Sequence, residues 1–230
     1  MRTLLLSLVV ILVFTGCYDE PDYPLTPRLT GIDVYFKDMP SLSDSLVIRV
    51  DFEDGDGDLG LYTDENQVFG PFEPQLDPST GEFLVYDSEN PDPRLPPYDC
   101  RTYLDFDPTP LDTVDDRDTI LVEYNEEYYN FSITLYQLID GQYEEYDLRS
   151  PPLCSAPLGG RFIPLKDDFD NKKPLKGTIQ YGTESALFST LFINDTLKID
   201  VAIRDRAGNM SNVISKEGFT LREVEIPVQQ

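Results

Sequence analysis

Residues 46–52 read LVIRVDF, and from Ile48 onward apolar and polar side chains alternate. Ile48, Val50 and Phe52 fall on one face of an extended chain, and Arg49 falls on the other. This period of two predicts a half-buried β-strand. A strand with one apolar face has to bury that face against other elements, so the stretch predicts a layered β fold around it.

Similar stretches recur along most of the chain. Further strands are predicted at residues 32–36, 119–124, 128–139, 142–148, 176–181, 196–204 and 212–221. Beyond residues 1–16, no stretch of about ten residues keeps a helical period. Short strands separated by turn residues are typical of a sandwich. The sequence therefore predicts an all-β protein built as an antiparallel β-sandwich.

Residues 62–118 differ from the rest because nine prolines interrupt any long element. Proline removes a backbone donor and is confined to the edges of sheets and to bulges. We interpret this segment as a long insertion that decorates the sandwich. A separate small domain is the alternative.

The chain begins with an apolar run, residues 4–14, that leads through Thr15 and Gly16 to Cys17. The run is shorter than the roughly 20 residues that span a bilayer, and it suits the core of a signal peptide. The stretch resembles the bacterial lipoprotein signal, which implies cleavage after residue 16 and acylation of Cys17. Several acyl chains would anchor the protein stably to a membrane. An ordinary secretory leader is the alternative.

Residues 17–28 are interpreted as the acylated cysteine and a tether, because Pro21, Pro24 and Pro27 favour an extended chain. Residues 18–20, YDE, resemble the acidic export tag of Bacteroidota-type lipoproteins. That resemblance implies an outer-membrane protein facing the cell exterior, with the periplasmic face as the alternative. Residues 29–230 would form the sandwich and its insertion.

Composition narrows the function classes. The 230 residues include 43 Asp and Glu against 18 Lys and Arg, which gives a net charge of −25. Such a surface repels nucleic acid, so nucleic-acid binding is excluded. The chain contains no histidine, which removes Ser-His-Asp and Cys-His catalysis and most zinc sites. The 14 Tyr and 13 Phe indicate a folded chain rather than a disordered one.

The two remaining cysteines are predicted to pair. With Cys17 assigned to the anchor, Cys100 and Cys154 would share an oxidising compartment, where a disulfide is expected. A pair of reduced thiols or a metal-binding pair are the alternatives.

A resemblance extends the prediction of the fold. Residues 205–212 read DRAGNMSN after an alternating strand, like the last hairpin of bacterial immunoglobulin-like and fibronectin-III-like domains. The resemblance implies that Asp205 caps the turn, that Gly208 takes a positive φ and that Ser211 begins the return strand. Together with residues 50–60, it is also similar to uncharacterised Bacteroidota surface lipoproteins. The resemblance does not extend to residues 62–175.

One acidic stretch suggests a metal site. Residues 51–58 hold five carboxylates, of which Asp54, Asp56 and Asp58 alternate with Gly55 and Gly57. Calcium prefers several oxygen ligands at flexible angles, and glycines allow a tight loop, so calcium is the predicted cofactor. The stretch is not an EF-hand, because leucine follows Asp58 where glycine is required and a strand precedes the loop. A solvated turn is the alternative.

Topology adds two candidate ligands to this site. If the strands that precede residues 54–58 and 205–209 run to the same end of a sandwich, the two loops are neighbours. We then expect Asp205 or Asn209 to complete the ion site.

The predicted function is a non-enzymatic surface module that binds an unidentified protein or glycan or serves as an envelope component. Tyr128, Tyr136, Tyr143 and Tyr146 are candidates for a stacking platform. The alternative is a membrane-anchored hydrolase that uses paired carboxylates, as glycosidases do.

Overall fold

The computed structural model describes residues 21–38, 44–62, 69–106, 118–166, 172–185 and 188–227. These residues form ten β-strands and one five-residue helix, α2 (Phe188–Phe192). The protein is all-β, as the sequence predicts. The described residues include no helix that is long and apolar enough to cross a membrane. The predicted signal peptide and Cys17 lie outside the described residues.

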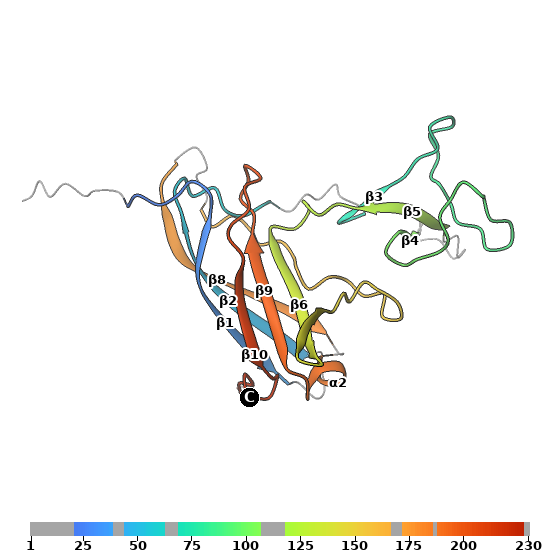
Figure 1. Cartoon of the computed structure of the whole chain (residues 1–230). Helices are drawn as coiled ribbons and strands as arrows, with labels where there is room; N and C mark the ends of the chain where they lie inside the picture. Colours follow the sequence, from blue (N-terminus) through green and yellow to red (C-terminus); the bar gives the residue numbers. More distant parts are fainter. Residues whose placement is uncertain are drawn as a thin grey trace, which may run out of the picture.

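Two antiparallel sheets form the body of the molecule (Figure 1). The first has the order β1-β2-β8 and the second the order β10-β9-β6-β7. Their bounds are β1 (Arg28–Lys37), β2 (Asp44–Asp54), β6 (Phe131–Ile139), β7 (Gln142–Glu145), β8 (Leu175–Ser185), β9 (Leu197–Ile203) and β10 (Ile214–Phe219). The chain crosses between the sheets after β2, β7 and β8, as in immunoglobulin-like sandwiches. The strand after β6 pairs with β6 rather than with β8, so the first sheet has three strands and the second has four.

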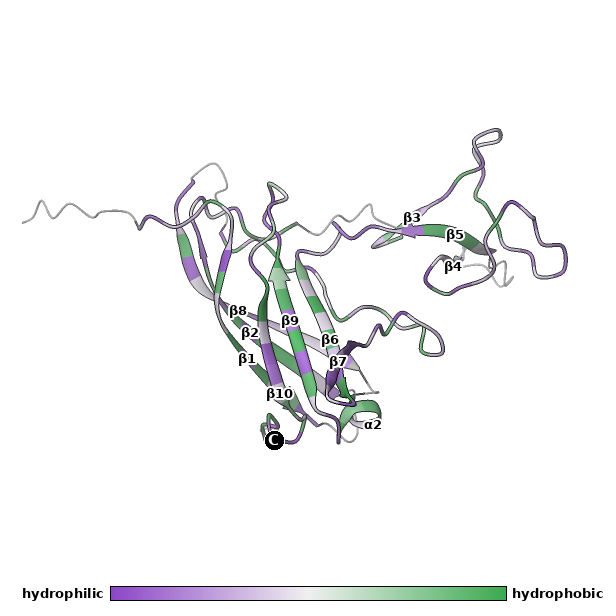
Figure 2. Ribbon diagram, viewed as in Figure 1, coloured by the Kyte–Doolittle hydropathy of each residue, from purple (hydrophilic) through white to green (hydrophobic). Residues whose placement is uncertain are grey.

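The core lies between the two sheets. Ile48 and Val50 of β2 are fully buried, as are Ile199 and Ile203 of β9 and Phe131 of β6. Figure 2 shows apolar and polar bands along these strands. The period-two pattern read from residues 46–52 therefore produces the core directly, because alternate side chains of a strand point to opposite faces.

A third, smaller sheet stands to one side of the sandwich (Figure 1). It consists of β3 (Phe72–Pro74), β5 (Asp118–Tyr124) and β4 (Tyr103–Phe106), in the order β3-β5-β4. The insertion was expected to end near residue 118, but β5 belongs to this sheet and extends the insertion to Tyr124. Ile120 and Val122 are buried there. Alternation in a sequence predicts a strand but not the sheet that the strand joins.

A disulfide ties the third sheet to the sandwich. Cys100 precedes β4 and bonds to Cys154, which lies in the crossing between β7 and β8; their Cα atoms are 5.6 Å apart. The structure thus joins the two cysteines that the sequence predicts to pair. Near the same place, the Arg149 guanidinium lies 4.6 Å from the centroid of the Tyr124 ring. The third sheet is therefore held both by its chain connections and by this cross-link.

The disulfide predicts a measurable loss of stability. Replacing both cysteines by serine opens a covalent loop with a sequence separation of 54. On the chain-entropy model this lowers the free energy of unfolding by about 4 kcal/mol. Urea unfolding of the double variant measures the loss, and treating the wild-type chain with reductant should reproduce it. An unchanged unfolding midpoint in both experiments would contradict the prediction.

Candidate metal centre

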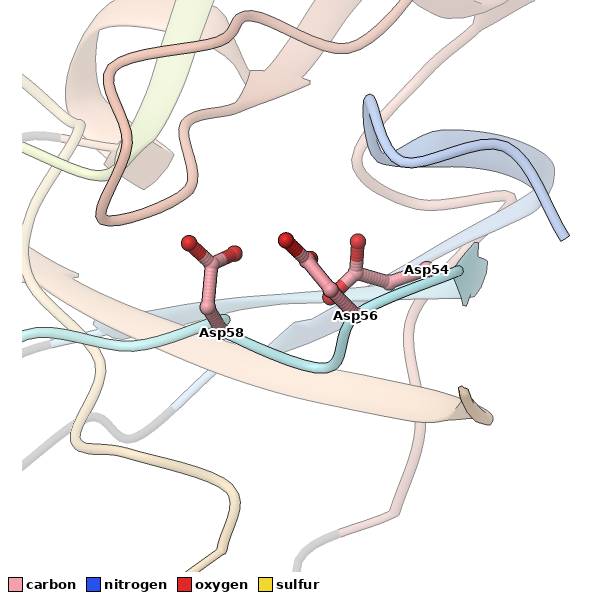
Figure 3. Close-up of side chains that lie close together, drawn as sticks. All are labelled: Asp54, Asp56 and Asp58. Atoms are coloured by element: carbon pink, nitrogen blue, oxygen red, sulfur yellow. The ribbon is translucent and has the colours of Figure 1, made fainter. Parts of the chain in front are cut away.

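Three carboxylates converge where β2 ends. Asp54 is the last residue of β2, and Asp56 and Asp58 follow on the loop that leads into the insertion. One oxygen from each of the three side chains lies within 4.8 Å of the others. Figure 3 shows the side chains gathered on the same side of the loop. We call Asp54, Asp56 and Asp58 the carboxylate cluster.

The cluster contains buried acceptors without donors. Asp54 is fully buried, and neither of its side-chain oxygens has a hydrogen-bond partner among the described residues. One oxygen of Asp56 and one of Asp58 are in the same condition. Removing an ionised carboxylate from water costs several kcal/mol unless a partner compensates it, and three such groups also repel one another. The arrangement therefore requires protons or a cation.

The pKa values of Asp54 and Asp58 reflect the free-energy cost of burying charged carboxylates close together. Burial, followed by the charges of Asp56, Asp58 and Asp205, raises the pKa of Asp54 from 3.8 to about 7. The backbone N–H of Asp58 offsets part of this rise, although it does not reach hydrogen-bonding geometry with Asp54. Burial and the charges of Asp205 and Asp56 also raise the pKa of Asp58, while Arg206 opposes that rise. A bound cation would relieve both shifts, because it favours the charged form of each carboxyl.

The loop after β9 lies beside the cluster, as the sandwich topology predicts. Asp205 forms an isolated antiparallel bridge with Leu59, and the backbone nitrogen of Arg206 lies 3.4 Å from the carbonyl oxygen of Asp58. Asp205 is almost fully buried, and its charge acts on both Asp54 and Asp58. The loop of residues 54–58 and the loop of residues 205–209 therefore lie together at one end of the sandwich.

Asp205 and Asn209 mainly serve the turn in this structure. The backbone and side-chain nitrogens of Asn209 donate to the two carboxylate oxygens of Asp205, at 2.7 and 2.8 Å. Gly208 has a φ of +89° in this turn, the conformation expected from the sequence. Asp205 thus caps its turn while facing the cluster, and ligation of an ion by Asp205 or Asn209 stays a prediction.

The loop is packed so tightly that its glycines are required. A Cβ atom on Gly55 would lie 2.4 Å from the carbonyl oxygen of Tyr23, and the Gly55 N–H donates to the carbonyl of Pro24 at 2.8 Å. Gly57 has a φ of +66°, and its Cβ would lie 2.3 Å from the carbonyl oxygen of Lys173. The glycines therefore let the tether and the crossing close around the cluster.

Two lysines near the site were missed by the sequence reasoning. The Nζ of Lys166 donates to the backbone carbonyl of Asp56 at 2.9 Å, and the Nζ of Lys172 lies 3.9 Å from a side-chain oxygen of Asp56. Both lie more than 100 residues along the chain from Asp56, so no local pattern links them to the loop. They reduce the negative charge at the edge of the cluster but leave both oxygens of Asp54 without a partner.

The donor set suits a hard divalent cation. Calcium binds carboxylate oxygens at about 2.3–2.6 Å, so two of its ligands lie at most about 5 Å apart. The oxygens of the cluster meet this limit. The described ligands are oxygens alone, which disfavours zinc and copper. Asp54, Asp56 and Asp58 therefore fit a calcium ion, with further oxygens to come from the surrounding loops.

A scan of family models, a search of curated proteins and a search of solved structures each found no match for this chain. Function therefore has to be argued from the chemistry of the site rather than from kinship.

The cluster predicts that calcium stabilises the fold. A ligand that binds only the folded chain adds about 2.7 kcal/mol at a hundredfold excess over its dissociation constant. We expect millimolar calcium to raise the melting temperature of residues 18–230, and Asp56→Ala to abolish the shift. Asp33→Asn is the matched control, because Asp33 is an exposed aspartate on β1, away from the loop. A calcium shift that survives in Asp56→Ala would contradict the assignment.

The raised pKa of Asp54 predicts a pH dependence of known sign. Without a cation, the folded chain keeps a proton on Asp54 that the unfolded chain loses above about pH 4, so this contribution to stability falls as the pH rises through about 7. In chelator, Asp54→Asn should therefore gain stability relative to wild type between pH 5 and pH 8. Saturating calcium should reverse the order at pH 8. Urea unfolding measures both, and a difference independent of pH would contradict the prediction.

Proposed function

We propose that this chain is a non-enzymatic surface lipoprotein, anchored to the outer membrane at Cys17, whose immunoglobulin-like sandwich is a binding or structural module. In this proposal a calcium ion fixes the end of the sandwich where the tether enters and the insertion leaves. The observation that carries the proposal is the set of buried, unpaired carboxylate oxygens at that junction. A metal in this position would hold the module rigid rather than act on a substrate.

Contacts between the tether and the end of β2 support a particular orientation of the module relative to the membrane. The Gly55 N–H donates a hydrogen bond to the carbonyl of Pro24. Arg28, at the start of β1, forms an ion pair with Glu53, which lies beside the cluster. Lys176 of β8 also bonds to Glu53, at 2.9 Å. Five residues lie between Cys17 and Tyr23, and a fully extended chain would span about 20 Å from the one to the other. An anchor at Cys17 would therefore keep the cation end close to the membrane, with α2 and the β6–β7 hairpin facing away.

The insertion starts from the same junction. Leu59 is fully buried, and the N–H of Leu61 donates to the carbonyl of Phe162 at 3.0 Å. The segment that carries the insertion out of the sandwich is thus packed immediately after Asp58. A cation held by Asp54, Asp56 and Asp58 would stiffen the base of the insertion, which suits a module that presents a surface to a partner.

The geometry disfavours the alternative of a carboxylate hydrolase. The two carboxyls of a glycosidase stand about 5–9.5 Å apart across a space that admits the sugar. Asp54 and Asp58, the carboxyls with raised pKa values, crowd within 4.8 Å, and Asp54 is inaccessible to solvent. The chain also lacks the histidine on which many hydrolases rely. The crowding and burial of these carboxyls support an ion site rather than a sugar-hydrolysing pair.

Three of the four tyrosines proposed as a stacking platform, Tyr128, Tyr136 and Tyr146, pack against other side chains of the protein. The Tyr128 ring lies beneath the Arg161 guanidinium at 4.7 Å, and the Tyr136 ring lies beneath the Lys198 amine at 4.7 Å. Tyr146 packs edge-on against Phe192 in the core, with 4.9 Å between ring centroids. These three rings each pack against a side chain of the protein itself, which argues against a common stacking surface; Tyr146 also lines the cavity described below.

Acylation tests the proposal directly. In a bacterial host supplied with labelled palmitate, the chain should incorporate label, and Cys17→Ser should abolish incorporation and release the protein from the membrane fraction. Cys100→Ser is the matched control. Cleavage by protease added to intact cells would place the module on the exterior, and protection would place it on the periplasmic face. A wild-type chain that takes up no label would contradict the anchor.

A further inference from the structure

A cavity of about 270 Å³ lies on the outer face of the second sheet. Its floor includes Ser132 and Thr134, the outward-facing residues of β6. Its walls come from Tyr124 at the end of β5, from the crossing that follows β7 and from the start of the last hairpin. The cavity thus lies where the insertion, the crossing and the sandwich meet, and the carboxylate cluster takes no part in it.

Covalent and polar contacts hold the walls in place. The Cys100–Cys154 disulfide ties the crossing to the third sheet. Within the crossing, Asp147 accepts from the backbone of Arg149 at 3.0 Å and from the Ser150 hydroxyl at 3.2 Å. Arg149 in turn covers the Tyr124 ring. Gly160 pairs with Phe131 through two backbone hydrogen bonds, of 2.9 and 3.0 Å. A site built in this way is preorganised, which lowers the entropy cost of binding.

Arg204 gives the cavity a donor that lacks an acceptor. Its Nη1 donates to Glu127 at 3.0 Å, but its Nε is buried and has no partner in the part of the chain that the structure describes. Glu127 is largely exposed, so that ion pair contributes little to stability. A buried guanidinium N–H without an acceptor costs free energy. Because this N–H is buried, a ligand oxygen reaches it only if the Arg204 side chain shifts toward the cavity, and pairing the donor would favour that shift.

The charges around the cavity select the class of ligand. Glu126, Glu145 and Asp147 line it together with the guanidinium groups of Arg149 and Arg204. The three carboxylates oppose an anionic ligand, and the two guanidinium groups oppose a cationic one. A neutral ligand whose hydroxyls both donate to carboxylates and accept from guanidinium groups matches this set.

Apolar side chains of the cavity wall also suit a sugar ligand. Leu148, Leu158 and Met210 form part of the wall, and Met210, the most exposed of the three, suits the C–H face of a sugar ring. The cavity is smaller than the 300–1,000 Å³ or so that is typical for drug-sized ligands, which points to a single ring.

We propose that this cavity binds one neutral sugar residue of a glycan. The inference rests on the proposed binding function and names the class of its ligand. Arg204 supplies the donor, Ser132 and Thr134 contact ring hydroxyls on the floor, and Glu145 accepts from a hydroxyl at the rim. The disulfide is then part of the binding site, because it fixes the wall that carries Arg149 and Leu148.

Calorimetric titration of the full chain tests this proposal, in a detergent without a sugar headgroup. The neutral probes are the methyl glycosides of glucose, galactose, mannose and N-acetylglucosamine. Glucuronate and glucosamine carry the same ring with a negative and a positive charge. We expect saturable binding of at least one neutral glycoside, and at least tenfold weaker binding of both charged sugars.

The variants locate the site. Arg204→Gln and Ser132→Ala should each weaken binding of the neutral glycoside, the first at least tenfold. Lys198→Gln is the matched control, because Lys198 lies on β9 outside the cavity and should bind within twofold of wild type. Melting temperatures in calcium confirm that each variant is folded. The Ser132→Ala change removes one hydroxyl and keeps the measurement informative if Arg204→Gln does not fold.

Three results would overturn the proposal: no binding of any neutral glycoside, preference for a charged sugar, or wild-type affinity in both cavity variants. None of these affects acylation at Cys17 or the calcium-dependent melt. A failure of the sugar site is therefore distinguishable from a failure of the proposed function. Conversely, loss of acylation with intact sugar binding would contradict the lipid anchor and leave the sugar site standing.

Discussion

The organisation of this protein depends on three carboxylates that share a dry space at the end of β2. Asp54 is the last residue of a core strand and is fully buried, so it cannot turn outward without leaving the sheet. Asp56 and Asp58 are held to it by a loop that packs against the tether on one side and the crossing on the other. This junction is stable only if the charge is compensated. The buried carboxylates therefore have to be neutralised by protons or by a cation at the place where β2, the tether and the crossing meet.

A second constraint acts away from this junction. The Cys100–Cys154 disulfide fastens the third sheet to the crossing, while the chain connection fastens it next to the carboxylate cluster. Two attachments limit the motion of the third sheet more than either does alone. The cavity beside Arg204 lies between them, and its walls are drawn from both attached segments. The disulfide, together with the cation that we propose, would thus constrain the same face of the module from two directions.

Local sequence patterns were sufficient to predict part of the fold and part of the candidate site. The alternation of Ile48, Val50 and Phe52 predicted a core strand, and the alternation of Asp54, Asp56 and Asp58 with glycines predicted a tight acidic loop that could hold a cation. Strand order then placed Asp205 beside that loop. Contacts between distant segments could not be predicted. Lys166 and Lys172 reach Asp56 from the crossing, and the burial of the Arg204 Nε depends on how segments distant in the sequence pack around it. Whether β5 pairs within the insertion or within the sandwich depends on its neighbours, because its alternation fits either sheet.

The most direct test of the central claim is a crystal structure grown with calcium, with anomalous diffraction collected at long wavelength. The account predicts one anomalous peak per chain among Asp54, Asp56 and Asp58, with carboxylate oxygens about 2.3–2.6 Å from it. Density for an amine nitrogen of Lys166 or Lys172 between the carboxylates, or for water without an anomalous signal, would contradict it. In that case the charge of the junction would be balanced by protons and lysines, and the cation would have no part in the fold.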